Sequence, residues 1–347
     1  MHGASRRSLL IGAAALAGCA APPRTSARAA APAKPAPPPP ADLQARLTEI
    51  ASSFDGRFGV AVRDLAAGWT AGFDGARLYP QQSVAKLWTA LAVFDAIDHG
   101  RLQLEQTVRV SAADMSVFHQ PLRARVLSGP VDVSVDALLT AALAQSDNAA
   151  DDVLIRLVGG DRVVQRAVDA RGLGAIRAGP QEHDLQSWIA GLDWRPEYAV
   201  GDAFERARDR VPAEMRRARM TAYLADPPEG AAPDALTRAL GLLSQGRLLS
   251  PASTARFLEI LQSTTTGPNR LKAGLTPGWS FAHKTGTGQD FAGLSTGYND
   301  VGIATAPDGR VFTLAAMMAA TGRTIPERML AMQAVSRALA EWVAGSG

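Results

Sequence analysis

Cysteine and lysine are scarce in this chain of 347 residues. It has one cysteine, Cys19, and only four of its 36 basic residues are lysines, namely Lys34, Lys86, Lys272 and Lys284. A single cysteine excludes an internal disulfide. The five histidines show no ligand-like spacing either, so the sequence lacks the features of a zinc site. Because arginine supplies all other positive charge, the retained lysines need a chemical explanation.

Long apolar runs and clusters of like charge are also absent. No unbroken run of about 18 apolar residues predicts a spanning helix. The net charge is only +3, and the most arginine-rich segment, 205–219, interleaves acids with its arginines. We therefore expect a solvated helix face there and no nucleic-acid partner. With 47% hydrophobic residues, the chain is long enough to bury a large core.

The N-terminus has the pattern of an export signal. Ser5-Arg6-Arg7 is a twin-arginine pattern before the apolar run 9–17, and the sequence LAGC ending at Cys19 resembles the lipobox of bacterial lipoproteins. We expect a signal peptide at residues 1–18, export to the periplasm by the twin-arginine route, and a lipid anchor on Cys19 that holds the protein to a membrane. A cleaved signal with an incidental cysteine is the alternative. The Ala/Pro-rich residues 19–41 predict an extended tether.

Apolar periodicity in residues 42–347 predicts strands at both ends of one domain and helices between them. The expected elements are an entry helix at 43–52, a β-hairpin from 58–62 and 69–73, strands at 281–287, 301–305 and 311–318, a turn at 307–309, and a final helix at 325–343. The region 83–266 has an almost entirely helical pattern. We expect one sheet from residues 53–80 and 275–347, with a helical lobe at 81–274 inserted between them.

The segment QQSVAKLW places a lysine three residues after a serine. This spacing puts Lys86 one turn along on the same helix face as Ser83. The helix has an apolar stripe formed by Val84, Leu87, Leu91, Phe94 and Ile97. We therefore expect Lys86 to be partly desolvated. Desolvation lowers the pKa of a lysine, and a neutral amine can accept a hydroxyl proton, which an arginine cannot do. Alone the motif is weak, because a serine that begins a helix is often a cap.

Two further motifs follow in order along the chain. Ser146-Asp147-Asn148 follows an apolar helical run, and Lys284-Thr285-Gly286 lies in a predicted strand. Ser-x-x-Lys, Ser-Asp-Asn and Lys-Thr-Gly in this order are the signature of class A β-lactamases and penicillin-binding proteins. The chain resembles class A serine β-lactamases over essentially all of residues 42–347. The segments that resemble the PER-type subgroup are QSVAKL, QSDN, TTTGPNRLK, AHKTGTG and YNDVG.

This resemblance implies a fold and a set of roles. The implied fold is α/β (α+β): a five-stranded antiparallel sheet flanked by helices, beside an all-helical lobe, with the active site in the cleft between them. The implied catalytic residues are Ser83, Lys86, Ser146 and Glu182. The implied substrate-binding residues are Asn148, Lys284, Thr285, Gly286, Thr287 and Arg270. We expect a β-lactam substrate, no cofactor or metal, and a monomeric enzyme.

The position of Glu182 follows from counting along the chain. From Ser146, the pair Gly159-Gly160 falls at the family's spacing, and Glu182 then falls at the glutamate that activates the hydrolytic water. Two neighbours depart from the family, because His183 stands where proline is common and Gln186 where asparagine is common. The longer amide of Gln186 is expected to position the water. Residues 187–232 look like an unusual insertion, and a surface-loop acid is the alternative interpretation of Glu182.

The resemblance implies a serine β-lactamase that hydrolyses the β-lactam amide through a Ser83 acyl-enzyme, with deacylation by water that Glu182 activates. A penicillin-binding DD-peptidase shares the three motifs, and a non-catalytic β-lactam-binding lipoprotein would keep the site but lose deacylation. Both alternatives stay open. A metal-dependent lactamase lacks its ligands, and no Gly-x-Ser-x-Gly brackets Ser83 as an α/β-hydrolase would require.

Overall fold

The computed structural model describes residues 1–2 and 36–346. The expected signal peptide, Cys19 and most of the expected tether fall on residues 3–35, outside the described residues. Contacts within the chain separate Met1–Pro35 from Ala36–Gly347, and the account that follows concerns the second unit. In the described part of the chain, no helix combines the length and the apolar character needed to cross a membrane.

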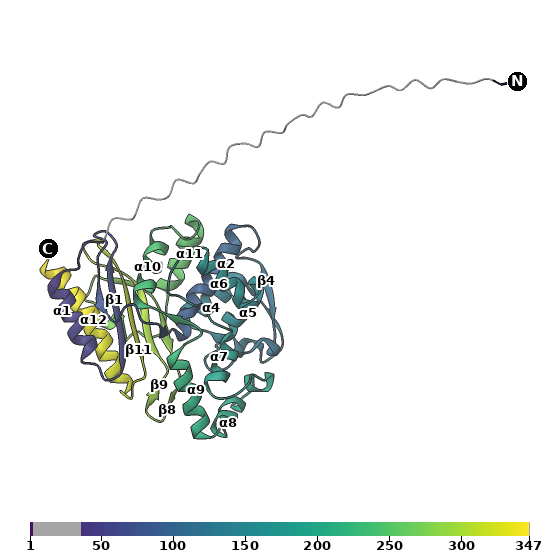
Figure 1. The fold of residues 1–347 in the computed structure, drawn as a ribbon. Helices are drawn as coiled ribbons and strands as arrows, with labels where there is room; N and C mark the ends of the chain where they lie inside the picture. Colours follow the sequence, from purple (N-terminus) through teal and green to yellow (C-terminus); the bar gives the residue numbers. More distant parts are fainter. Residues whose placement is uncertain (3–35, 347) are drawn as a thin grey trace. The chain divides into compact units, whose positions relative to one another are not determined.

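A five-stranded antiparallel sheet forms the scaffold (Figure 1). Its strands, in the spatial order β2-β1-β11-β10-β7, are β2 (Thr70–Phe73), β1 (Arg57–Asp64), β11 (Val311–Ala319), β10 (Tyr298–Thr305) and β7 (Ser280–Thr287). Strands from the two ends of the domain pair directly, since Val60 of β1 lies opposite Ala316 of β11. The expected five-stranded sheet that joins both ends of the domain is confirmed.

Strand β11 shows that the sheet is buried on both faces. Leu314, Ala316 and Met318 belong to one apolar core, and the alternating residues Ala315 and Met317 belong to the other. Successive side chains of a β-strand point to opposite faces of the sheet, which explains this alternation. The first core contains α1 (Ala41–Ser52) and α12 (Ile325–Gly345), and the second contains α10 (Pro233–Ser244) and α11 (Pro251–Gln262). In Figure 1, α1 and α12 lie side by side on one face of the sheet and α10 and α11 on the other.

The helical lobe contains short strands that the periodicity did not predict. Its helices are α2 (Lys86–Asp98), α3 (Arg123–Val126), α4 (Val135–Ala144), α5 (Asn148–Val158), α6 (Asp161–Asp169), α7 (Glu182–Ile189), α8 (Ala203–Asp209) and α9 (Ala213–Ala225). Single 3₁₀ turns occur at Gln82–Ala85, Ala112–Asp114, Pro196–Ala199 and Leu271–Gly274. The short strand pairs are β3 (Tyr79–Pro80) with β6 (Gly230–Ala231), β4 (Thr107–Val110) with β5 (Val131–Ser134), and β8 (Asp290–Phe291) with β9 (Leu294–Ser295). The expectation of an almost entirely helical region is wrong at β4, β5 and β6, because strands this short give too few alternations to be recognised.

Helix α2 is buried on nearly all sides, which corrects the predicted apolar stripe. Its buried residues run without a break from Lys86 to Phe94. The helix contacts α4, α5, α6 and α11, and a helix surrounded in this way needs apolar residues around its whole circumference. Lys86 is 1% exposed, so its desolvation is complete and not partial.

Candidate active site

Ser83 lies in the 3₁₀ turn Gln82–Ala85, immediately before α2. It makes no capping hydrogen bond to the helix, so the interpretation of this serine as a cap is wrong. The Ser83 hydroxyl accepts a hydrogen bond from Lys86 Nζ at 2.7 Å and donates one to Glu182 Oε1 at 3.3 Å. Ser83, Lys86 and Glu182 are therefore in direct contact, although 99 residues of chain separate Ser83 from Glu182.

The ammonium of Lys86 is held by three acceptors. Besides Ser83, it donates to Asn148 Oδ1 at 2.7 Å and to Glu182 Oε1 at 2.6 Å. Asn148 in turn donates one of its two amide hydrogens to Val117 O at 2.9 Å, which leaves the second for another acceptor. These contacts fix Lys86 between the nucleophile, the glutamate and the Ser-Asp-Asn motif.

Glu182 is the first residue of α7 and is buried, which excludes the alternative of a surface-loop acid. Burial raises the pKa of this carboxyl, but the charge and the hydrogen bond of Lys86 outweigh the effect and the pKa lies below its usual value. The backbone N–H of Glu182 donates to Asp152 Oδ1 at 2.6 Å, and His183 Nδ1 lies 2.8 Å from Asp152 Oδ2. Asp152 and His183 thus hold the start of α7 against α5.

Gln186 links Glu182 to the turn that contains Ser83. Its side-chain amide donates to Glu182 Oε2 at 3.2 Å and to Gln82 Oε1 at 3.0 Å. Gln82 Nε2 donates to the hydroxyl of Tyr223 at 2.6 Å, and that hydroxyl contacts the carboxylate of Glu229. Burial raises the pKa of Glu229 to about 7. A continuous chain of hydrogen bonds therefore runs from Glu182 to a second buried acid.

Ser146 lines the same cavity as Ser83, and it is hydrogen-bonded to Lys284. Lys284 Nζ donates to Ser146 Oγ at 2.8 Å and to Thr285 O at 3.0 Å. Burial lowers the pKa of Lys284 well below the usual lysine value, and the charge of Lys86 adds to this effect. Asp147, not Ser146, caps α5, because its side chain accepts a hydrogen bond from Ala150 N. Ser146 is thus free of a capping role and is directed toward Lys284.

The end of β7 lies against the segment that precedes Ser83. Gly286 is required at this point, because a Cβ atom there would lie 2.3 Å from Gln81 O. Asn299 of β10 donates to the same Gln81 oxygen at 3.0 Å. Arg270 donates to Gly286 O at 2.9 Å and to Thr287 Oγ1 at 2.6 Å, and it stacks on the Tyr298 ring. The buried guanidinium therefore supports the edge of β7 from behind.

Most of these side chains line one cavity of about 440 Å³. Its lining residues are Ser83, Phe118, His119, Ser146, Asn148, Glu182, Gln186, Arg208, Thr266, Arg270, Thr285, Thr287, Gly288 and Gln289. Backbone strain is concentrated here: Gln82, Phe118 and Ser146 are three of the six non-glycine residues with positive φ in the described chain. Such conformations cost about 1–3 kcal/mol each and persist where the surrounding structure enforces them, often at functional sites.

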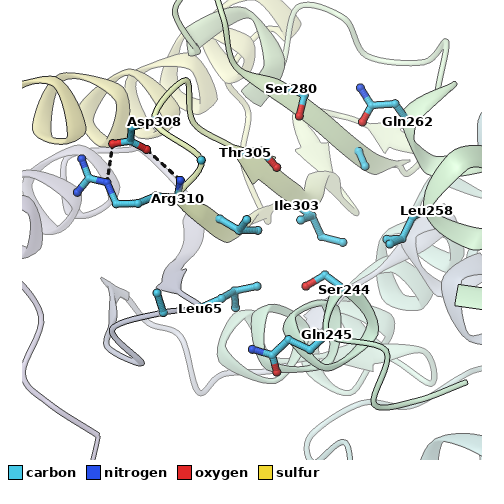
Figure 2. Close-up of a pocket in the computed structure, with 14 residues that line it drawn as sticks. Leu65, Ser244, Gln245, Leu258, Gln262, Ser280, Ile303, Thr305, Asp308 and Arg310 are labelled. Atoms are coloured by element: carbon cyan, nitrogen blue, oxygen red, sulfur yellow. Dashed lines mark hydrogen bonds and ion pairs between the residues drawn. The ribbon is translucent and has the colours of Figure 1, made fainter. Parts of the chain in front are cut away.

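A larger cavity, of about 740 Å³, lies at the opposite end of β7 (Figure 2). Its lining includes Ser244 and Ser280 but no lysine or histidine. Its one acid, Asp308, pairs with Arg310 at 2.8 Å, as the dashed lines in Figure 2 show. This cavity therefore lacks a free base to activate its serines, which the smaller cavity provides for Ser83.

Several residues at the site escaped the sequence analysis because their contacts are long-range. They are Gln82, Asp151, Asp152, Tyr223, Glu229 and Asn299. Asp151 is 3% exposed, and burial raises the pKa of its carboxyl to about 7. Gln82 lies within the quoted QSVAKL segment and Asn299 within YNDVG, and these two segments were the available signals. Within residues 1–2 and 36–346, no three His, Cys, Asp or Glu side chains form a metal-binding cluster.

The arginine-rich segment 205–219 differs from the expected solvated face. Arg216 is 8% exposed and lies over the Phe291 ring at 3.9 Å from its centroid. Arg208 lines the active-site cavity. The expectation is wrong for these two residues because α8 and α9, which belong to the segment predicted as an insertion, pack beside the cleft.

Comparisons with known proteins agree on one family. A family model described as the beta-lactamase enzyme family matches residues 42–343. The chain is 26% identical over 284 residues to the beta-lactamase VEB-1 of Pseudomonas aeruginosa, which covers 82% of this chain and 84% of that protein. It is 30% identical over 240 residues to the extended-spectrum beta-lactamase PER-1 of the same species, which covers 68% of this chain and 66% of that protein.

Solved structures give the same result. A beta-lactamase from Chitinophaga pinensis superimposes with a TM-score of 0.71 at 28% identity, over 87% of this chain and 99% of that one. The family model spans residues 42–343, and the resemblance to class A and its PER-type members is confirmed. The chain therefore belongs to the β-lactamase enzyme family, as a class A member.

Proposed function

We propose that the protein hydrolyses the amide of β-lactams through a covalent acyl intermediate on Ser83. One observation carries this proposal: Lys86 Nζ and Glu182 Oε1 lie 2.7 Å and 3.3 Å from the Ser83 hydroxyl oxygen. A serine becomes a nucleophile when an adjacent base can take its proton. The Glu182 carboxylate and, once it has released a proton, the Lys86 amine are both in contact with this one.

In the acylation step, Ser83 Oγ attacks the lactam carbonyl carbon and gives up its proton toward Lys86 and Glu182. The C–N bond then breaks, and the ring nitrogen receives a proton through the hydroxyl of Ser146. Lys284, at 2.8 Å from Ser146 Oγ, supports this transfer as a nearby cation. The backbone N–H groups of Ser83 and Thr287 would hold the developing oxyanion, at about 3 kcal/mol per donor.

The substrate would be held at both ends of the lactam. Asn148 has one amide hydrogen left to donate to the substrate's side-chain amide. The ring carboxylate would meet the hydroxyls of Thr285 and Thr287, which line the cavity in the field of Lys284 and Arg270. Because Arg270 is occupied by Gly286 O and Thr287 Oγ1, we assign it a supporting role behind Thr287.

Deacylation would use Glu182 as the general base. Its lowered pKa keeps the carboxylate ionised and able to take a proton from water. The water oxygen attacks the ester carbonyl, the C–O bond to Ser83 breaks, and the proton returns to the serine. Both amide hydrogens of Gln186 are already donated, so its contribution would be its carbonyl oxygen, which accepts one hydrogen bond from Gln289 and has room for a second.

The test separates a hydrolase from a DD-peptidase or a binding protein, because these share acylation and differ in deacylation. Intact-protein mass spectrometry after addition of benzylpenicillin should show little adduct on the wild type and a persistent adduct on Glu182→Gln. The loss of the general base should slow deacylation by about 10²–10⁴-fold. Ser83→Ala is the control and should form no adduct.

Two results would contradict the proposal. A wild-type protein that stays acylated for hours would favour the DD-peptidase or binding function. Equal turnover by the wild type and Glu182→Gln would mean that another group activates the water.

A further inference from the structure

Helix α8 places a cation in the active-site cavity that the proposed mechanism does not use. Arg208 lines this cavity, and its guanidinium carbon lies 5.9 Å from the centroid of the Phe118 ring. Arg208 Nε is buried and has no hydrogen-bond partner among residues 36–346. Asp209 Oδ1 lies 3.7 Å from Nε, but that carboxylate is 68% exposed and makes only a weak surface pair. The charge of Arg208 is therefore available to a ligand.

The position of Arg208 is fixed by its own helix. Phe204, one turn earlier on α8, is 1% exposed and packs in a small core with Val117 and Ala190. Residues four apart share a helix face, so the anchor and the arginine point in the same direction. The Phe204 ring meets the Phe118 ring edge-on at 4.9 Å. Phe118 and Arg208 therefore form one wall of the cavity, and the buried Phe204 side chain holds this wall in place.

This wall lies at the side-chain end of the substrate. Asn148, the proposed ligand of the substrate amide, donates from Nδ2 to Val117 O at 2.9 Å and from its backbone to His119 O at 2.9 Å. Phe118 lies between these two contacts. The ring carboxylate is assigned to the opposite wall, at Thr285 and Thr287 of β7. A group that reaches Arg208 must therefore extend beyond the amide, away from the lactam ring.

We propose that Arg208 and Phe118 bind an anionic, aromatic acylamino side chain, so that the enzyme prefers β-lactams with a second carboxylate there. The proposal rests on the proposed function. The charge balance of the cavity supports it, since its one acid, Glu182, is paired with Lys86, while Arg208 and Arg270 add two cations. Arg216 is a third cation, close to Arg208: burial lowers the pKa of Arg216, and the charge of Arg208 adds to this effect.

The experiment compares benzylpenicillin with its α-carboxy derivative, which differs by one carboxylate beside the phenyl ring. The readout is the ratio of kcat/KM for the dianion to kcat/KM for the monoanion. A charge-assisted hydrogen bond contributes about 1.5–3 kcal/mol, so Arg208→Ala should lower this ratio about tenfold or more. Arg208→Lys should retain part of the preference, and the wild-type preference should weaken as salt screens the charge.

The matched control is Arg210→Ala, which removes the same charge from an exposed residue just after α8 that does not line the cavity. This control should leave the ratio within about twofold of the wild type, because exposed charges are screened. An equal loss for both penicillins in Arg208→Ala would overturn the inference, and so would a loss of the ratio in the control. In either case hydrolysis of benzylpenicillin by the wild type would leave the proposed function intact.

Acylation gives a second readout that does not depend on turnover. If deacylation is slow, the rates of adduct formation on Ser83 for the two penicillins report the same preference, and Arg208→Ala should remove it. Rapid, equal acylation by both penicillins in the wild type would overturn this inference and leave the proposed function standing. A protein that neither hydrolyses nor is acylated by either penicillin would overturn the proposed function and the inference together.

Discussion

Lys86 and Lys284 are fully buried at the active site, whereas Lys272 is exposed on the surface. The buried pair explains why lysine persists in a chain that otherwise uses arginine. Lys86 Nζ donates hydrogen bonds to three acceptors, and Lys284 Nζ, from β7, donates one to Ser146. A compact ammonium suits both positions, because a planar guanidinium would not fit among these oxygen atoms and would not release a proton.

His183 takes the place of a proline that is common in the family, and it has a defined partner. Its Nδ1 lies 2.8 Å from Asp152 Oδ2, and its ring lies 4.6 Å from that of Trp194, centroid to centroid. Burial lowers the pKa of His183, but the hydrogen bond and charge of Asp152 outweigh this effect and raise the pKa above its usual value. His183 thus helps to hold the start of α7, next to Glu182, and its contact with Asp152 favours the charged imidazole.

This contact predicts a pH-dependent contribution to stability. A histidine whose pKa is raised on folding stabilises the protein fully below its unfolded pKa of about 6.5, and the contribution is lost as the pH rises through the folded value. The difference in unfolding free energy between the wild type and His183→Asn should therefore be larger at pH 6 than at pH 8.5. Thermal unfolding over this range measures it.

The exposed His99, which directly follows α2, provides the control, and His99→Asn should show a smaller change in this difference between the two pH values. A difference for His183→Asn that is constant, or that grows as the pH rises, would show that Asp152 does not hold a charged imidazole.

At the scale of elements, α9 is tied to the turn that contains Ser83. Tyr223 of α9 is 0% exposed, and its hydroxyl accepts from Gln82 Nε2 and contacts Glu229. Glu229 Oε1 also accepts from the backbone N–H of Gln82 at 3.2 Å. Gln82 has a φ of 52°, which is a strained value for this residue. The segment predicted as an insertion therefore supports the strained residue next to the nucleophile.

Removing one oxygen tests this connection. Tyr223→Phe leaves Gln82 Nε2 without its acceptor and leaves Glu229 Oε1 with only the backbone N–H of Gln82, at a cost of about 1–3 kcal/mol of unfolding free energy. We also expect slower acylation of Ser83, since the turn is less firmly held. Chemical denaturation and stopped-flow acylation measure the two effects.

Tyr198→Phe makes the same chemical change in the same segment, at a half-buried tyrosine that packs on Phe204 and is not joined to Gln82. It should change stability by less than Tyr223→Phe and leave acylation unaltered. If Tyr223→Phe is acylated as fast as the wild type, α9 does not support the nucleophile's turn.

At the scale of the whole molecule, every described strand and helix lies within Ala41–Gly345. The twin-arginine and lipobox-like patterns remain the basis for its location. We propose that the protein is exported to the periplasm and anchored through Cys19. One acyl chain gives only marginal membrane binding, so the anchor would need several chains.

Fractionation of the producing cells tests this location. The wild type should sediment with membranes, and Cys19→Ala should appear in the soluble periplasmic fraction with its hydrolytic activity retained. Lys34→Ala, within the segment 19–41 predicted as a tether, removes no lipidation site, so it is the matched control and should stay with the membranes. A soluble wild type would contradict lipid anchoring but leave export untouched.

The sequence by itself determined the elements and motifs that depend on near neighbours. The spacing of three between Ser83 and Lys86 sets one helical turn, and the confirmed strands 281–287, 301–305 and 311–318 show alternation or unbroken apolar runs. The order of the three motifs then indicated the family. Counting along the chain also located Glu182, because the Gly159-Gly160 pair kept the spacing.

Only the tertiary structure decided which distant residues meet. Asp152 fixes the backbone of Glu182 across 30 residues, and Tyr223 reaches Gln82 across 141. Arg208 belongs to a segment whose alternating charges predicted a solvated face, yet the burial of Phe204 turns it into the cavity. Periodicity reports the environment of a residue relative to its neighbours within a turn or two. It cannot report which surface a helix will pack against. Here the packing of α7 against α5 and α9, and of Phe204 of α8 against Val117 and Ala190, decides it.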